Sequence, residues 1–135
     1  MTTVRLDTRE LDRIAKGLNR KRDKIVEGLA FEVERDAKIK APYITGALEG
    51  SIYTRTKKGG TRPKKMKGHN YVELPKPSGK IIAVVGSGIE YAAYVEFGHH
   101  TRGGSFVAAR PYLGPAVEGK ARKLNDGSTW RELFT

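Results

Sequence analysis

The chain has 135 residues, no cysteine, and 26 Lys and Arg against 15 Asp and Glu, which gives a formal charge of +11. A chain of this length is expected to form one domain over residues 1–135 with a real hydrophobic core. The absence of cysteine excludes disulfides and thiolate metal sites, and the excess positive charge favours an anionic partner.

The first predicted element is a long amphipathic helix over residues 8–40. Asp7-Thr8-Arg9-Glu10 fits a capping box. Residues 19–24 are wholly polar, so we expect there a solvated middle, an Arg22 side chain that lies along the apolar surface, or a bend. The apolar stripe recurs at helical spacing through Leu11, Ile14, Leu18, Ile25, Leu29 and Val33.

A continuous helix of this length would be about 50 Å long, whereas a sphere formed by the chain has a diameter of about 37 Å. The helix must therefore bend, or overhang its domain and pack on another subunit. Gly17, Gly28 and Phe31 share the side away from the main stripe, where two glycines would allow close helix approach. Alternatively, both glycines are simply tolerated and Phe31 covers a local gap.

The segment after this helix is predicted to turn into the sheet. Pro42 ends the helix, because the residue before a proline is driven out of the α region. Thr45 is placed to cap a short second helix that leads into a strand near Ile52. Ile44 and Leu48 should close the core beneath this junction.

A basic segment follows, with seven basic and no acidic residues over 55–67. Gly59-Gly60 and Pro63 disfavour a helix or a central strand, so we expect a long mobile loop over 55–79, with a short strand possible at 71–74. Loops of this length are uncommon in compact domains unless they serve binding. The candidate contact residues are Arg55, Lys57, Lys58, Arg62, Lys64, Lys65 and Lys67.

Three interpretations of this segment stay open. It is a solvated run that keeps the protein soluble, a contact to DNA phosphates without sequence readout, or a contact to an acidic protein surface. Residues 55–67 contain no aromatic side chain, which argues against stacking on single-stranded bases.

The remaining core is predicted over 81–124 as strand, helix, strand and helix. The run 81–85 has four β-branched residues in five, so we expect it to be the central strand, covered on both faces. After a turn comes a helix that ends at Gly98, which supplies a left-handed stop. Its apolar side is predicted to contain Tyr91, Ala92, Val95 and Phe97.

The C-terminal part begins with a glycine-rich loop over 98–105 and a short returning strand over 106–108. Pro115 lies in the first turn of the last predicted helix, where its missing N–H costs nothing. The tail 128–135 is apolar through Trp130 and Phe134. These two side chains dock either on their own core or on a neighbouring subunit.

No catalytic or metal-binding constellation is found. His99 and His100 are adjacent and diverge, and His69 is the only other histidine. Glu96 is the acid that we single out, as a structural residue: Arg102 and Arg110 could reach it as ion-pair partners, or it could accept a hydrogen bond at the Gly98 turn. We expect no cofactor and no enzymatic activity.

Three segments, at 41–52, 91–98 and 110–116, occur in an order that resembles the tail-completion, or head–tail joining, family of tailed bacteriophages. The resemblance covers roughly residues 8–122. The residues that carry it have architectural roles in that family: Pro42, Thr45, Gly46, Leu48, Tyr91, Ala92, Glu96, Phe97, Gly98, Arg110, Pro111, Pro115 and Ala116.

The resemblance implies an α+β domain, with a long N-terminal helix packed on a small, mostly antiparallel sheet, two shorter helices and a long basic loop. It implies a virion protein of the neck, made in the host bacterial cytoplasm, that forms a sixfold ring. Its partners would be copies of itself, the head connector, tail-tube or tail-terminator proteins, and genomic DNA in the channel, with no membrane contact. The rival hypothesis is a stand-alone, non-specific nucleic-acid-binding protein; a hydrolase lacks the motifs that it would need.

Overall fold

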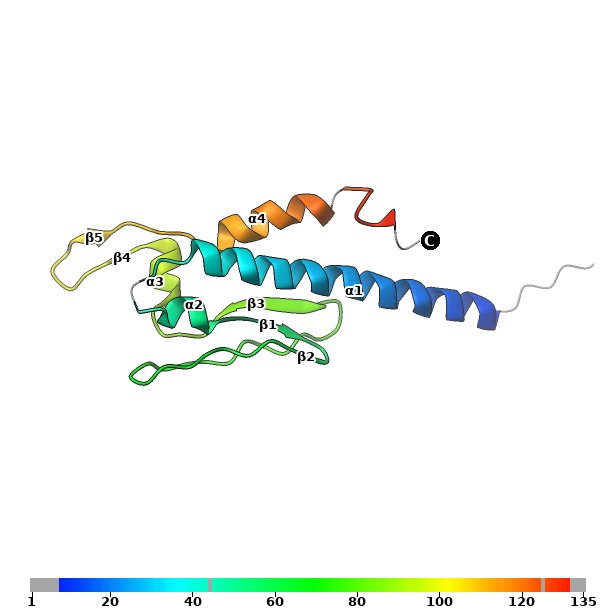
Figure 1. Ribbon diagram of the computed structural model, residues 1–135, viewed down its shortest axis with the longest axis horizontal. Coiled ribbons are helices and arrows are strands. Elements are labelled where there is room, and N and C mark those ends of the chain that lie inside the picture. Colours follow the sequence, from blue (N-terminus) through cyan, green and yellow to red (C-terminus); the bar gives the residue numbers. More distant parts are fainter. Residues whose placement is uncertain (1–7, 44, 125, 132–135) are drawn as a thin grey trace, which may run out of the picture.

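The structure is a computed structural model that describes residues 8–43, 45–124 and 126–131. It confirms the predicted α+β fold: one long helix, α1 (Thr8–Lys40), lies between a shorter helix and a small antiparallel sheet (Figure 1). None of the described helices combines the length and the apolar character that a membrane span requires.

Helix α1 runs without interruption over 33 residues. The bend considered for residues 19–24 is therefore absent, and Arg22 lies exposed beside Asp23, with 3.0 Å between Nη2 and Oδ1. Among the α1 side chains whose burial the structure describes, Ala30 is the first buried one. Its N-terminal half extends past the rest of the molecule (Figure 1), because the sheet and the shorter helix cover only the C-terminal half.

A short helix, α2 (Ala47–Ser51), connects α1 to the sheet. Gly46 precedes it in the left-handed conformation, with φ of 80°. The N-cap of α2 is Gly46 and not Thr45, so the capping role predicted for Thr45 was wrong. The Thr45 hydroxyl, one residue earlier, accepts a hydrogen bond from the N–H of Ala47 at 3.3 Å. Leu48 is buried as expected, whereas Ile44 lies outside the described residues.

The sheet has the order β2-β1-β3 and is antiparallel throughout. Its central strand is β1 (Ile52–Thr56), whose Ile52 and Thr54 side chains are fully buried. It pairs on one side with β2 (Gly59–Gly60) and on the other with β3 (Ala83–Ser87).

The sequence prediction of a central strand at residues 81–85 was therefore wrong. The β-branched run enters β3, which is an edge strand that begins at Ala83, and Ile81 before it is 55% exposed. The run is apolar because α1 lies against one face of β3 and the Leu74 side chain lies against Gly86 on the other. An apolar composition indicates that both faces of a strand are covered, but it does not indicate how many of the strand's edges pair with other strands.

Helix α3 (Ala92–Phe97) follows Tyr91 and ends at Gly98. Gly98 has φ of 76°, and a Cβ there would lie 2.8 Å from the carbonyl oxygen of Val107, so glycine is required. Ala92 is buried, but Phe97 is 77% exposed. Phe97 was predicted to lie on the apolar side of this helix, and that prediction was wrong: its side chain lies on the outer surface.

The chain then forms a hairpin of β4 (His99–His100) and β5 (Phe106–Val107) that projects from the body (Figure 1). The strand predicted at 106–108 does not return to the main sheet. Helix α4 (Leu113–Leu124), with Pro115 in its first turn, packs on α1 through the fully buried Ala116.

The core where these elements meet is built largely of small side chains. Alanines at five positions let the helices and the sheet approach closely, and the larger members include Leu48, Ile52 and Tyr112. The alanines are Ala37, Ala41, Ala47, Ala92 and Ala116. A core of this kind buries little apolar area per residue, so it leaves the isolated domain with a modest hydrophobic stabilisation.

Candidate functional site

The basic segment takes a defined course along the face of the sheet that lies away from α1. After β2, the N–H of Thr61 donates to the carbonyl of Thr54 at 2.9 Å, and the hydroxyl of Thr61 donates to Glu34 of α1. Further on, the N–H of Lys64 donates to the carbonyl of Gly50 at 2.7 Å. We call residues 61–67 the outgoing arm.

The chain reverses at Lys67 and Gly68 and comes back as the returning arm, residues 69–74. The N–H of Val72 donates to the carbonyl of Gly88 at 2.8 Å. The N–H of Leu74 donates to the hydroxyl of Tyr53 at 2.7 Å, and Arg55 donates to the carbonyl of Leu74 at 2.7 Å.

These contacts change the description of the loop predicted over 55–79. Arg55 and Thr56 belong to β1, and the strand suggested at 71–74 is reduced to a single bridge between Tyr71 and Ile89. Both arms are tied to the sheet by hydrogen bonds, and the Lys57 ammonium donates to the carbonyl of Gly79 at 2.9 Å. The mobility of the segment stays a prediction, and these ties argue against it.

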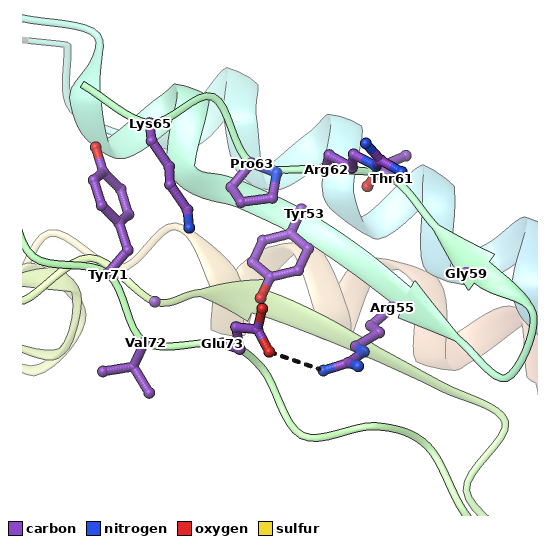
Figure 2. A pocket seen from close by; sticks show the side chains of 11 residues that line it. Tyr53, Arg55, Gly59, Thr61, Arg62, Pro63, Lys65, Tyr71, Val72 and Glu73 are labelled. Carbon is purple, nitrogen blue, oxygen red and sulfur yellow. Dashed lines mark ion pairs between the residues drawn. The ribbon is translucent and has the colours of Figure 1, made fainter.

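Between the two arms lies a recess of about 360 Å³ over the sheet (Figure 2). Cationic side chains line it from both sides: Arg55 from β1, and Arg62 and Lys65 from the outgoing arm. The hydroxyl-bearing rings of Tyr53 and Tyr71 complete the wall in the same view.

Charges in the recess are partly paired. Nη1 of Arg55 lies 3.9 Å from Oε2 of Glu73, whose side chain is 83% exposed (Figure 2). The ammonium of Lys65 lies 5.9 Å from the centre of the Tyr71 ring, within the range of a cation–π contact. Arg62 is exposed at the rim.

The seven basic residues proposed from the sequence are thus not one cluster. Arg55, Arg62 and Lys65 line the recess at separate places. Lys57 and Lys58 lie at the turn between β1 and β2, and Lys64 and Lys67 are exposed along the outgoing arm.

Among the residues of the recess that the sequence analysis missed are Tyr53, Tyr71 and Glu73. The position of Tyr53 could have been inferred, because residues i and i+2 of a strand share a face and Tyr53 therefore accompanies Arg55. Tyr71 and Glu73 reach the recess only through the reversal of the chain at Gly68, for which the sequence carries no pairing signal.

Glu96 has a structural role that differs from the one expected. Its carboxylate accepts hydrogen bonds from the backbone N–H groups of Tyr112, Leu113 and Gly114 at 3.0, 3.0 and 2.8 Å. These are first-turn donors of α4, which otherwise lack partners within the helix. Glu96 therefore joins α3 to the N-terminus of α4; no ion pair of Glu96 with an arginine is found within the described residues.

The same arrangement sets two pKa values. Burial alone would raise the pKa of Glu96, but the three N–H donors outweigh it and hold the pKa below its usual value. Burial, and next the charge of Glu96, raise the pKa of Tyr112 to about 12. The Tyr112 hydroxyl donates to the carbonyl of Ala92 at 3.4 Å, which ties α3 to the same junction.

The other family-motif residues lie around this junction. Pro42, Thr45, Gly46 and Leu48 form the α1–α2 connection, and Tyr91 packs against the core beside α3. Arg110 donates its backbone N–H to the carbonyl of Val95 at 2.8 Å, and Pro111 follows in the link to α4.

The candidate inter-subunit residues are mostly accessible. Cβ atoms added at Gly17 or Gly28 would meet no atom within 4 Å, and Phe31 is 38% exposed. Trp130 donates its indole N–H to the carbonyl of Leu124 at 2.6 Å, so within this chain it folds back on α4. Phe134 lies outside the described residues.

A second, apolar groove of about 290 Å³ opens between α1, β3 and α4. Val26 and Leu29 of α1, Val85 of β3 and Leu124 of α4 line it. Val117 beside them is 46% exposed, so this side of the α1–α4 pair is not fully covered.

The histidines do not converge. His69 contacts Glu90 at 2.8 Å, and the rings of His99 and His100 contact Tyr94 and Phe106 respectively. Among the described residues, no group of three or more His, Asp or Glu side chains is arranged to hold a metal ion.

Comparison with known proteins gives one match. A family model described as "Bacteriophage HK97-gp10, putative tail-component" matches residues 8–98, about two thirds of the chain. No curated protein and no solved structure matches. The matched stretch contains α1 to α3 and the first two motif segments, and the segment at 110–116 falls outside it. The chain therefore belongs to the HK97-gp10-like family of bacteriophage tail components.

Proposed function

We propose that this tail component acts at the head–tail junction, where copies of the chain form a sixfold ring. The ring joins the head connector to the tail tube or to the tail-terminator protein. It is made in the cytoplasm of the host bacterium and ends in the neck of the virion. The family membership supports a structural role, and we assign no catalytic step to the chain.

The observation that carries the proposal is the length of α1 relative to its body. A helix of 33 residues spans about 50 Å, and its N-terminal half lies beyond the sheet and α4 (Figure 1). Ile14, on the apolar stripe of this half, is 58% exposed. An isolated helix end gains little stability from propensity alone, so a neighbouring subunit is the natural cover for this stripe.

The opposite end of the molecule also has exposed apolar side chains. Phe97 beside the projecting hairpin is 77% exposed, and Phe106 within it is 61% exposed. A two-stranded hairpin is marginally stable without further packing. Two different surfaces at opposite ends fit a head-to-tail contact, which closes into a ring when the rotation permits.

Removal of the gene from the phage tests this role. We expect filled heads and completed tails to accumulate unjoined in electron micrographs of the lysate, and a plasmid copy of the intact chain to restore joined particles. A plasmid copy with an early stop codon is the matched control. Infectious, joined particles in the absence of the chain would contradict the proposal.

A second candidate function is non-specific nucleic-acid binding by the free chain. It is favoured by the formal charge of +11, which attracts polyanions at low salt. This function predicts normal particle maturation in the deletion strain, the opposite of the junction role.

A further inference from the structure

We infer that the recess between the two arms of the basic segment is an oxyanion site that receives a phosphate of a nucleic-acid backbone. The inference deepens the proposed function, because it names what the basic segment of a junction protein contacts. It concerns each single copy of the chain, so it can be tested without the ring.

The cations of the recess are positioned by the fold. Nη1 of Arg55 donates a hydrogen bond to the carbonyl of Leu74 at 2.7 Å and lies 3.9 Å from Oε2 of Glu73. The guanidinium lines the recess, and its planar fork of N–H donors suits a phosphate. The ammonium of Lys65 lies 5.9 Å from the centre of the Tyr71 ring, and Arg62 lies beside Thr61 on the outgoing arm (Figure 2). The cationic side chains of the recess therefore come from β1 and from the outgoing arm.

Two tyrosine hydroxyls add neutral donors. The oxygen of Tyr53 accepts from the N–H of Leu74, and the oxygen of Tyr71 accepts from the N–H of Met66 at 2.8 Å. A phenol that accepts one hydrogen bond still carries its own proton to donate. Both residues line the recess, so an anion there meets O–H donors as well as cations.

The aromatic rings of the recess are poorly placed for base stacking. Tyr53 is only 7% exposed, and the ammonium of Lys65 lies 5.9 Å from the centre of the Tyr71 ring. A base therefore has no open aromatic platform, and binding through the recess should read the phosphate and ignore the sequence. Duplex and single-stranded DNA are both suitable ligands on this ground.

The surroundings favour a polyanion over a single acidic side chain. Lys57, Lys58, Lys64 and Lys67 are exposed elsewhere on the same segment, and the successive phosphates of one backbone can reach more cations than one carboxylate can. Glu73 is the carboxylate that lines the recess. It is largely exposed, so it can turn outward when a phosphate replaces it beside Arg55.

The test uses fluorescence anisotropy with the purified full chain and a labelled duplex of about 20 base pairs, at about 20 to 200 mM salt. The double variant Arg62→Gln/Lys65→Gln should weaken binding at least about fivefold and reduce the slope of log affinity against log salt by about 2. The control Lys76→Gln/Lys80→Gln removes the same charge at exposed positions outside the recess and should change affinity less than about twofold.

Glu73→Gln gives a change in the opposite direction. It removes the competing carboxylate beside Arg55, so duplex affinity should rise by about twofold or more. Glu118→Gln removes the same charge at an exposed position outside the recess, and an equal gain there would contradict a specific role of Glu73. Thermal unfolding of each variant, followed by circular dichroism, checks that the fold is kept. Two duplexes of different base composition should bind equally.

Three results would overturn the inference. The first is equal weakening by the recess and control variants, which would mean that only net charge matters. The second is a recess-dependent affinity for poly-L-glutamate that exceeds the affinity for DNA, which would assign the site to an acidic protein. The third is no duplex binding at low salt. Each would leave the junction role intact, because that role is decided by the deletion strain.

Discussion

At the scale of single residues, Glu96 shows how a family motif stabilises the fold. It lies on α3, yet its carboxylate satisfies three backbone donors at the start of α4. Negative charge at a helix N-terminus is favourable for the additional reason that the helix dipole is positive there. One side chain therefore fixes the mutual position of two helices that are distant in the sequence.

Replacement of this carboxylate should be costly. Glu96→Ala leaves three partly buried N–H groups without an acceptor, and we expect a loss of about 1–3 kcal/mol in the free energy of unfolding, measured by urea denaturation. Glu118→Ala, at an exposed position of α4, is the control and should change stability by less than about 0.5 kcal/mol. Equal effects of the two variants would mean that Glu96 has no capping role.

The same residue predicts acid sensitivity. The folded-state pKa of Glu96 lies below its ordinary value of 4.5, so its stabilisation is fully present above pH 4.5 and is lost as the pH falls through the folded-state pKa. The stability difference between the wild type and Glu96→Gln should therefore shrink between about pH 5 and pH 3. Urea unfolding at several pH values measures it, and a difference that stays constant to pH 3 would exclude this linkage.

At the scale of elements, the sequence predicts what its own local pattern encodes. The apolar stripe and Pro42 place the long helix correctly over residues 8–40, because a helix is determined by neighbours three and four positions apart. The capping box begins at Asp7, outside the described residues, and stays a prediction. The order of the strands in the sheet, by contrast, was not predicted correctly. The apolar run at 81–85 looks central, but strand order depends on the partner chosen by β1, and no residue within the run encodes that choice.

The candidate site was predictable to a similar degree. Composition correctly singles out the cationic segment, but the recess needs the returning arm, which is placed by Val72, Gly88 and the hydroxyl of Tyr53. A Cβ at Gly88 would lie 1.7 Å from the carbonyl oxygen of Val72, so that glycine is a condition of the close approach. Contacts between residues that are far apart in the chain leave no periodic pattern in the sequence.

Gly28 of α1 gives a test of the assembly surface at the element scale. No atom lies within 4 Å of a Cβ built at Gly28 or at Gly119 of α4. Gly28→Gln and Gly119→Gln should each stabilise the monomer, by up to about 1 kcal/mol, because glycine is a poor helix former. Only Gly28→Gln should reduce head–tail joining when it is supplied to the deletion strain, because its side chain would occupy the proposed subunit contact; normal joining would exclude Gly28 from that contact.

At the scale of the whole molecule, the stabilising contacts are concentrated in one half. The core lies where the C-terminal half of α1 meets the sheet, α2, α3 and α4, and five of its members are alanines. The N-terminal half of α1 and the β4–β5 hairpin extend from opposite ends of that core (Figure 1). This distribution fits the proposed ring, in which neighbouring copies would bury both exposed ends.

The most direct test is a cryo-electron microscopy reconstruction of the neck of the virion that contains this chain. We predict a closed ring of copies between the head connector and the tail, in which the N-terminal half of α1 contacts the adjacent subunit and the basic segment faces the DNA. A neck without density for the chain, or a ring in which the N-terminal half of every α1 is free of neighbours, would contradict this account.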